Sequence, residues 1–176
     1  MFVMEQSPTN ATISRIGFIG NYSPRQCGIA TFTTDLCEAI AAEYSGTTCI
    51  ALPVNDNGAG YAYPARVRFE LTEKDIDSYR RAADFLNTNN VDLVSLQHEY
   101  GIFGGDDGGY LLDFVYALRV PAVVTLHTVL KRPSENQAAI VRKMWERCEQ
   151  LIVMSQIARD LLATSYGVSG SKVRIV

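Results

Sequence analysis

The sequence predicts an α/β domain built on a doubly wound, mainly parallel β-sheet. Short apolar segments, many of them rich in β-branched residues, run too continuously to have a solvated face, which is typical of strands buried on both sides of a parallel sheet. Helical patterns lie between most of these segments, and a repeated strand–helix–strand order implies right-handed crossovers. With 176 residues, of which 47% are hydrophobic, the chain is large enough to bury the core of one domain.

The expected strands follow one another along the whole chain. In chain order they are residues 14–20 (SRIGFIG), 47–53 (TTCIALP), 66–71 (RVRFEL), 91–98 (VDLVSLQH), 121–127 (PAVVTLH), 150–155 (QLIVMS) and 172–176 (KVRIV). We therefore expect a sheet of about seven strands, in line with their alternation with helices.

Helices are expected where apolar residues recur at helical spacing. Such stripes consist of Phe32, Leu36 and Ile40 within residues 31–44, and of Ile76, Tyr79, Ala83 and Leu86 within residues 74–87. A further helix is expected over 156–166, with Ser155 as its N-cap and Gly167 as its C-cap. Residues 1–12 are polar and expected to be disordered, and residues 54–65 form the longest irregular connection.

Composition excludes several functional classes. A net charge of −3 and an isoelectric point near 5.4 show no excess of positive charge that would attract nucleic acid or acidic membranes. The four cysteines are scattered without a C-x-x-C pair, so we expect reduced thiols in a cytoplasmic protein. The sequence shows no signal peptide, and no apolar run approaches the ~18 residues of a membrane span.

Ligands of doubly wound sheets bind beyond the carboxyl ends of the strands, and the connector after the first strand has an unusual composition there. The stretch NYSPRQCGIATFTTDL lacks G-x-G-x-x-G, so a dinucleotide fingerprint is not supported. Gly28 lies just ahead of a helix and is followed by Ala30 and Thr31, which leaves backbone N–H groups facing an anion. A tight strand-to-helix turn without a ligand explains the same residues equally well.

The connector after the fourth strand, LQHEYGIFGGDDGGYLLDF, combines polar groups with glycines. Gln97, His98, Glu99 and Tyr100 end the strand, and the five glycines that follow predict a mobile, functional loop. The alternative for His98 is a histidine exposed to solvent or bonded to the backbone. Asp106 and Asp107 raise the question of a metal, but the chain has only two histidines and no ligand spacing, so no metal site is expected.

The connector after the fifth strand begins with the other histidine. His127 ends the apolar segment VVTLH, so a polar ring emerges where ligands bind, and Lys131, Arg132 and Pro133 follow before the next helix. A satisfied core histidine is the alternative. Three such connectors at one edge of the sheet together favour a ligand site.

These segments resemble the N-terminal domain of family 4 retaining glycosyltransferases, which have the GT-B architecture of two Rossmann-like domains. PRQCGIATFTTDL is similar to the family's loop under the donor diphosphate, and VVTLHT to the segment that holds its active-site histidine. LQHEYGIFGGDDGG is similar to a subgroup with an acceptor-side cluster, and residues 151–176 to the segment before the interdomain hinge. One departure is Cys27, which stands where the first loop glycine is usual.

The resemblance implies transfer of a sugar from a nucleotide-sugar donor to an acceptor hydroxyl, with retention and with no metal or other cofactor. It implies these roles: donor diphosphate binding by Gly28, Ile29 and Arg25; catalysis by His127, bonded to the donor sugar or a phosphate oxygen; acceptor binding by Gln97, His98, Glu99, Tyr100, Gly104 and Gly105. The acceptor class is a sugar, a polysaccharide end, a lipid-linked sugar or a small molecule.

The family continues into a second Rossmann-like domain that carries a Glu-x7-Glu motif and binds the donor. The given chain, whose domain spans residues 13–176, stops at Val176 before such a domain. We therefore expect either a fragment or a partner polypeptide, and no activity from these residues alone. Two alternatives stay open: half of a GT-B-like epimerase or phosphorylase, and a non-catalytic Rossmann-like binding module.

Overall fold

The computed structural model describes residues 13–56 and 58–176, and its described part forms one seven-stranded sheet. The strands are β1 (Arg15–Gly20), β2 (Thr48–Asn55), β3 (Leu71–Thr72), β4 (Leu93–His98), β5 (Ala122–Leu126), β6 (Gln150–Val153) and β7 (Val173–Ile175). Their order across the sheet is β3-β2-β1-β4-β5-β6-β7, and every neighbouring pair is parallel. The predicted doubly wound parallel sheet is thus confirmed, while residues 1–12, expected to be disordered, lie outside the described residues.

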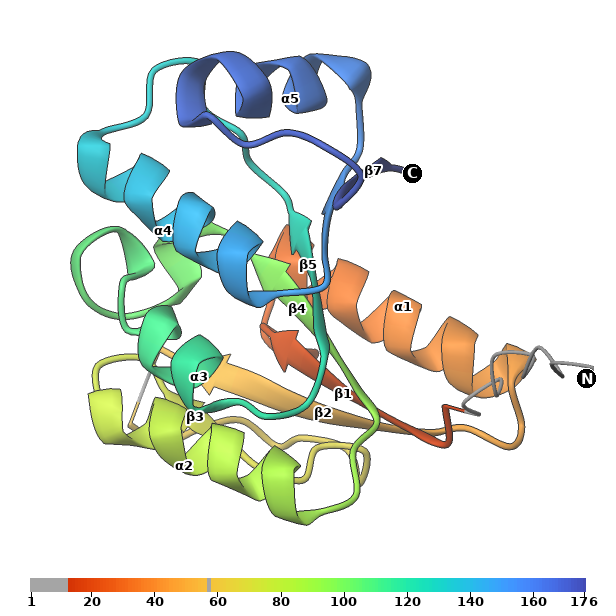
Figure 1. The fold of residues 1–176 in the computed structure, drawn as a ribbon. Helices are drawn as coiled ribbons and strands as arrows, with labels where there is room; N and C mark the ends of the chain where they lie inside the picture. The colour runs from red at the N-terminus through yellow and green to blue at the C-terminus, as the bar shows by residue number, and fades with distance from the viewer. Residues whose placement is uncertain (1–12, 57) are drawn as a thin grey trace, which may run out of the picture.

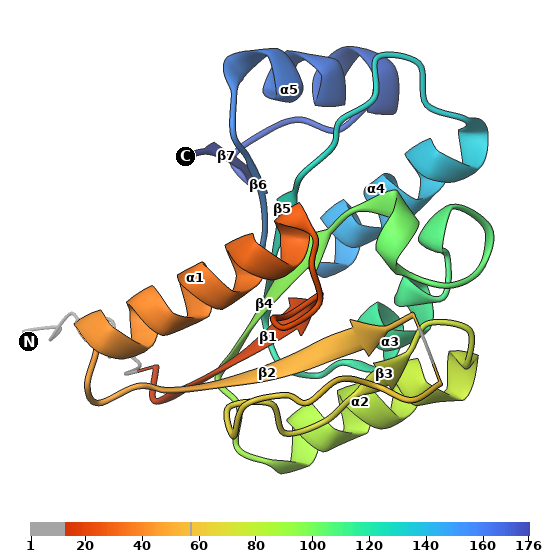
Figure 2. The ribbon, with the colours of Figure 1, turned by 180° about the vertical axis from the view of Figure 1, so that it is seen from behind.

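Helices cover both faces of this sheet. They are α1 (Gly28–Glu43), α2 (Ile76–Thr88), α3 (Leu111–Ala117), α4 (Glu135–Arg147) and α5 (Gln156–Leu161). In Figures 1 and 2, α2, α3 and α4 lie in a row on one face, α1 lies on the opposite face, and α5 lies near β6 and β7. These faces are called the α2–α4 face and the α1 face below.

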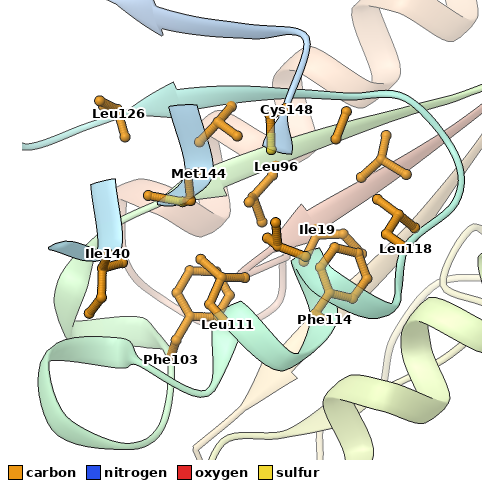
Figure 3. Close-up of a cluster of buried hydrophobic side chains, with 14 of the residues drawn as sticks. Ile19, Leu96, Phe103, Leu111, Phe114, Leu118, Leu126, Ile140, Met144 and Cys148 are labelled. Atoms are coloured by element: carbon orange, nitrogen blue, oxygen red, sulfur yellow. The ribbon is translucent and has the colours of Figure 1, made fainter. Parts of the chain in front are cut away.

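The larger part of the core lies on the α2–α4 face. Alternate strand residues such as Ile19 and Leu96 point to this face and meet Phe114 and Met144 from the helices, as Figure 3 shows. All four side chains are fully buried. Burying a side chain of this size stabilises the fold by about 1.5–3 kcal/mol, so this face holds most of the hydrophobic stabilisation.

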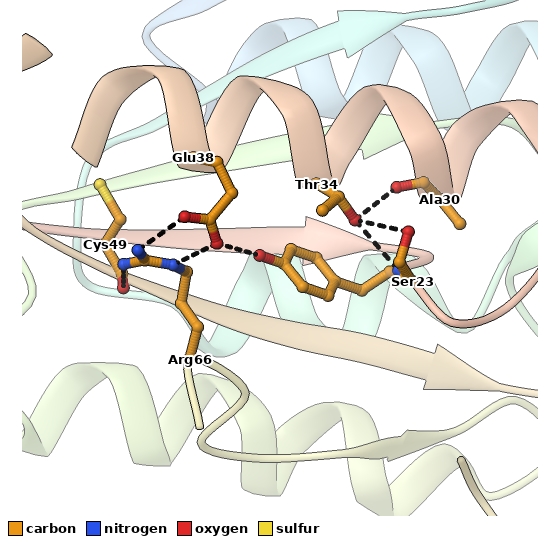
Figure 4. A network of polar contacts seen from close by, with 7 residues as sticks. Ser23, Ala30, Thr34, Glu38, Cys49 and Arg66 are labelled. Carbon is orange, nitrogen blue, oxygen red and sulfur yellow. Dashed lines mark hydrogen bonds and ion pairs between the residues drawn. The ribbon is translucent and has the colours of Figure 1, made fainter. Parts of the chain in front are cut away.

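The α1 face has a smaller core with a polar border. Cys37 and Cys49 are buried in it, and burial raises the pKa of the Cys37 thiol to about 12. Beside them, the Glu38 carboxylate accepts hydrogen bonds from Arg66 Nη2 at 2.7 Å and from the Tyr22 hydroxyl at 3.1 Å (Figure 4). Arg66 also donates to the Cys49 carbonyl at 3.1 Å, so the network fastens α1 to the segment that follows β2.

Two expectations about this face need correction. The segment 66–71 touches β2 at one bridge, Ala51–Val67, and pairs as a strand from Leu71 onward, where Leu71 and Thr72 lie opposite Val54 and Asn55. The α1 stripe is confirmed in part: Leu36 and Ile40 pack partly buried against this core, whereas Phe32 is 37% exposed and the fully buried residues are Ala30, Thr33 and Cys37. Thr33 tolerates burial because its hydroxyl donates to the Ile29 carbonyl at 2.7 Å.

The helix signals elsewhere are confirmed. Tyr79, Ala83 and Leu86 of the predicted α2 stripe are fully buried, although Ile76, at the start of the helix, is 37% exposed. Ser155 caps α5 by accepting from the Ala158 N–H at 3.1 Å. A π-helical turn, Leu162–Tyr166, continues α5, and Gly167 ends it in the left-handed conformation, with φ of 70°.

Candidate functional site

The candidate site lies at the carboxyl edge of the sheet, where the strand order reverses. β1 has β2 on one side and β4 on the other, and such a switch point is where doubly wound sheets bind ligands. A Cβ added to Gly20, the last residue of β1, would lie 2.9 Å from Cβ of Gln97. The backbone N–H of His127 donates to the His98 carbonyl at 3.0 Å. The predicted convergence of the three connectors on one edge is therefore confirmed.

His127 lies between β4 and α1. Its ring nitrogen Nε2 is 3.0 Å from Oε1 of Gln97, and its ring meets Phe32 of α1 edge-on, with centroids 4.7 Å apart. Burial lowers the pKa of His127, while the nearby Glu99 carboxylate acts in the opposite direction. The side chain is thus a half-buried, neutral imidazole at neutral pH. Phe32 is one helical turn beyond Gly28, which places His127 close to the start of α1.

The N-terminus of α1 offers free backbone donors. Cys27 is the N-cap, and its Sγ accepts from the Ala30 N–H at 3.3 Å and from Asn21 Nδ2 at 3.2 Å. The N–H groups of Gly28 and Ile29 have no hydrogen-bond acceptor within the described residues, and no atom lies within 4 Å of a Cβ built on Gly28. Helix N-termini attract anions through these N–H groups and the helix dipole. The predicted anion position is therefore open in spite of Cys27.

Gln97 and His98 lie on opposite faces of β4. Gln97 shares the α1 face with His127 and is fully buried, and its amide Nε2 donates to Ser95 Oγ at 3.0 Å. His98 points to the α2–α4 face, where its ring meets Tyr100 edge-on at 4.8 Å and stacks on Phe103 at 6.3 Å. The predicted acceptor cluster is therefore divided between the two faces.

The ring of His98 has an uncommon environment. It is 1% exposed, and neither of its nitrogens has a hydrogen-bond partner in the part of the chain that the structure describes. Burial lowers its pKa to about 3, with the neighbouring His127 adding to the effect. Each buried polar group without a partner costs about 1–3 kcal/mol. His98 is thus a neutral ring whose two nitrogens are available to any group that reaches them.

Glu99 and Tyr100 connect the loop after β4 to its neighbours. Glu99 accepts a hydrogen bond from the Tyr100 N–H at 3.0 Å and a short one from the Thr128 hydroxyl. The Tyr100 hydroxyl is 3.3 Å from that of Tyr166, which accepts from the Leu130 N–H at 2.9 Å. The loops after β4 and β5 and the end of the α5 segment therefore form one hydrogen-bonded assembly around the site.

A comparison with known protein families identifies the family of this chain. The sequence model of Glycosyltransferase Family 4 matches residues 27–176. The chain belongs to glycosyltransferase family 4. The match includes the start of α1, the Gln97–Tyr100 cluster and His127, whereas Arg25 lies just before it. No curated protein matches the sequence. With its all-parallel sheet, the chain is an N-terminal, Rossmann-like domain of this family.

The Arg25 side chain is held in place by hydrogen bonds and an ion pair within the domain. Its Nη1 donates to Asn21 Oδ1 and to the Val54 carbonyl, both at 3.1 Å, and its Nη2 lies 3.1 Å from Asp56 Oδ2. The side chain is only 14% exposed. In this arrangement Arg25 fastens the loop after β1 to the end of β2, so contact with a phosphate requires it to leave these partners.

The glycine loop is more tightly packed than its composition predicted. The Gly104 N–H donates to the Tyr79 hydroxyl at 2.8 Å, and a Cβ on Gly104 would lie 1.8 Å from the Glu73 carbonyl oxygen. Gly105 has a positive φ of 78° and lies against the ring of Tyr110. These two glycines therefore allow the backbone to approach Glu73, Tyr79 and Tyr110 closely, and the mobility expected of the loop stays a prediction.

Asp107 adds a second attachment for the same loop. It has a positive φ of 54°, and its carboxylate accepts from Asn136 Nδ2 at 2.9 Å, Gln137 Nε2 at 3.0 Å and Ser134 Oγ at 3.3 Å. All three donors belong to the first turn of α4 or its cap. The carboxylate considered in the sequence as a metal ligand therefore holds the loop against α4. Within residues 13–56 and 58–176, no group of three or more His, Cys, Asp and Glu could hold a metal ion.

Sequence reasoning missed three residues of the site. Phe32 contacts His127, Thr128 bonds Glu99, and Tyr166 links Tyr100 to the loop after β5. Phe32 belonged to the apolar stripe expected for this helix, so its contact with His127 had no separate signal in the sequence. Tyr166 offered none, because it lies 66 residues from Tyr100 and only the fold brings the two hydroxyls together.

Hollows elsewhere on the surface do not contain the predicted site residues. A hollow of about 670 Å³ is lined by Asp84, Tyr116, Arg119, Arg147 and others around α2, α3 and α4. This hollow does not coincide with the candidate site, which we assign by its chemistry. None of the helices in the described residues has the length and apolar character needed to cross a bilayer.

Proposed function

We propose that this domain forms the acceptor side of an enzyme that transfers a sugar from a nucleotide-sugar donor to an acceptor hydroxyl, with retention and without a metal ion. Family membership supports a glycosyltransferase. The observation that carries the finer proposal is the position of His127, held by Gln97 on one side and next to the open N-terminus of α1 on the other.

The donor side of the proposal rests on α1. The unpaired N–H groups of Gly28 and Ile29 bind an oxygen of the leaving diphosphate, and the positive end of the helix stabilises the charge that develops on it. His127 contacts the donor sugar or a phosphate oxygen near the anomeric carbon. Backbone donors and a fixed ring need no reorganisation during the reaction, which is why no metal is invoked. Arg25 joins only after release from Asp56.

The acceptor side of the proposal rests on the loop after β4. Glu99 and Tyr100 offer a carboxylate and an aromatic face in that loop, Gln97 holds His127 beside it, and Gly104 and Gly105 shape the loop beyond them. A hydroxyl can donate to the Glu99 carboxylate, which favours a hydroxyl-bearing acceptor, whereas His98 is 1% exposed on the other face of β4 and does not face this acceptor. Sugars, polysaccharide ends, lipid-linked sugars and small molecules all meet this requirement.

Catalysis also requires a second domain that grips the nucleotide. Closing two domains over the donor excludes water and aligns the reacting atoms. We therefore propose a cytoplasmic enzyme with a Rossmann-like donor-binding domain. Residues 1–176 alone should show no transfer and a donor Kd above ~1 mM, a binding free energy weaker than about −4 kcal/mol. Calorimetric titration with common nucleotide sugars measures this, and micromolar binding would contradict it.

The proposal is tested by His127→Ala in the protein that includes the donor-binding domain. We expect turnover to fall by roughly 10²-fold or more, the scale of a positioned polar group, with an unchanged melting temperature. A large loss of stability with normal specific activity would instead identify a core histidine. Activity that survives a metal chelator, and a product whose anomeric configuration matches the donor's, test the other two parts.

A further inference from the structure

The side chain of Gln97 joins the interior of the sheet to the ring of His127. Its Nε2 donates to Ser95 Oγ and its Oε1 is directed at His127 Nε2, each over 3.0 Å. Gln97 is fully buried and Ser95 is 8% exposed, so water does not compete for these bonds. The amide is therefore occupied at both ends, and its burial keeps an acceptor from reaching it.

From this geometry we propose that Gln97 is a positioning residue: its carbonyl oxygen holds the proton of His127 on Nε2 and so presents Nδ1 as a hydrogen-bond acceptor to the ligand. The inference replaces the acceptor-binding role that the sequence implied for Gln97. The effect of Gln97 on sugar transfer rests on the proposed function, whereas the position of the proton on His127 does not.

The physical argument begins with the amide. An amide carbonyl accepts but never donates, so the ring nitrogen that faces it must carry the proton. In a neutral histidine the other nitrogen is then an acceptor, and the hydrogen bond made by one nitrogen sets the state of the other. Reversing the amide would place its N–H₂ group against His127 Nε2 and would produce the opposite tautomer. Ser95 Oγ can donate as well as accept, so the proposal rests on the orientation that the structure shows, with Nε2 on Ser95 and Oε1 on His127.

The second nitrogen of His127 is accessible. Nδ1 makes no hydrogen bond within the described residues, and it is not among their buried unpaired atoms, unlike both nitrogens of His98. Burial lowers the pKa of His127, so the ring is neutral at neutral pH even though Glu99 opposes this. The ring therefore offers a lone pair at Nδ1.

This lone pair narrows what His127 binds. A sugar hydroxyl can donate a proton to Nδ1, whereas an unprotonated phosphate oxygen has none to give. Of the two contacts implied for His127, the donor sugar and a phosphate oxygen, the geometry favours the sugar. The diphosphate is left to the N–H groups of Gly28 and Ile29.

The proton position is measured directly by ¹⁵N NMR of the imidazoles in the full chain, where His98 and His127 are the only histidines. A His127→Gln variant assigns the two sets of signals by removing one. We expect a protonated-type shift at His127 Nε2 and an unprotonated-type shift at Nδ1 near neutral pH. The reverse pattern, or an equal mixture of the two tautomers, overturns the inference.

Two variants of Gln97 separate positioning from packing. Gln97→Glu keeps an oxygen against Nε2 and should keep the proton there; because its charge raises the pKa of His127, the tautomer is read at a pH where the ring is neutral. Gln97→Met has a similar size but no such acceptor and should give a mixture of the two tautomers. Asn87→Leu is the matched control. It removes another side-chain amide that makes two hydrogen bonds, one to the Ala117 carbonyl and one from the Arg119 N–H, far from His127. The control should lower stability and leave the His127 signals unchanged. A changed tautomer in the control, or an unchanged one in Gln97→Met, rejects the role.

Turnover then distinguishes this inference from the proposed function. In the protein with its donor-binding domain, Gln97→Met should reduce kcat by about tenfold or more with little change in KM, and Gln97→Glu should recover part of the loss. If His127→Ala retains full activity, the proposed function fails while the NMR result stands. If His127→Ala is inactive but Gln97→Met keeps normal kcat, the positioning role fails alone.

Discussion

The two glycine-bearing loops at the carboxyl edge of the sheet have opposite environments. At Gly28, where the loop after β1 enters α1, an added Cβ would meet no atom within 4 Å. At Gly104, in the loop after β4, the same addition would place Cβ 1.8 Å from the Glu73 carbonyl oxygen. One loop leaves its backbone open, and the other uses glycine to bring its backbone against α2. Glycine content alone therefore does not distinguish a loop with an open backbone from a loop whose backbone is closely packed.

The largest effect is expected from Gly104→Ala. The new Cβ would overlap backbone and the ring of Tyr110, which cannot both move without disturbing α2 and α3. Overpacking typically costs 1–3 kcal/mol, and a clash with backbone should reach about 3 kcal/mol or more. Denaturant unfolding of the two proteins measures the difference. A loss below about 0.5 kcal/mol would show that the loop is as open as its composition suggested.

We expect the free energy of unfolding to depend on pH through His98. Burial lowers its pKa in the folded protein to about 3, whereas an unfolded histidine protonates near pH 6.5. Between these values the unfolded state binds more protons, so stability present above pH 6.5 is lost as the pH falls. The slope should be about 1.4 kcal/mol per pH unit relative to His98→Phe, measured by denaturant unfolding from pH 7 to 4. Equal slopes in the two proteins would mean that His98 is solvated.

The smallest effect on stability is expected from Gly28→Ala. Because no atom opposes the added methyl group, the free energy of unfolding should change by less than about 1 kcal/mol, in the stabilising direction. Binding of a nucleotide-sugar donor to the two-domain protein should nevertheless weaken, since the methyl group occupies the space before the Gly28 and Ile29 N–H groups. Unchanged donor affinity would indicate that the diphosphate lies elsewhere.

Strands and helix ends were predictable because their causes are local. All seven apolar segments form or adjoin strands, and Ser155 and Gly167 end the α5 segment as expected. The buried stripe of α1 was not predictable in the same way. Hydropathy favours Phe32 over Thr33, but Thr33 satisfies its hydroxyl within the helix and packs against the sheet, which leaves Phe32 for His127.

The candidate site was predictable as a place but not as a set of contacts. Strand ends fixed the positions of Gln97, His98 and His127. The alternation of side chains across β4 then separated Gln97 from His98, which no short motif reveals unless the sheet faces are known. Arg25 also needed the fold, because its partners Val54 and Asp56 come from the end of β2 and the residue after it.

The different exposure of the cysteines means that a thiol reagent can label the end of the loop after β1 selectively. Cys37, Cys49 and Cys148 are buried, and burial raises the pKa of Cys148 to about 11, whereas Cys27 at the start of α1 is partly exposed. Since thiolates are the reactive form and need access to the reagent, a thiol-directed fluorophore should attach first at Cys27. Among residues 1–176, Cys27 is thus the labelling position beside the Gly28 N–H, and a fluorophore there would report changes at the start of α1 through its emission.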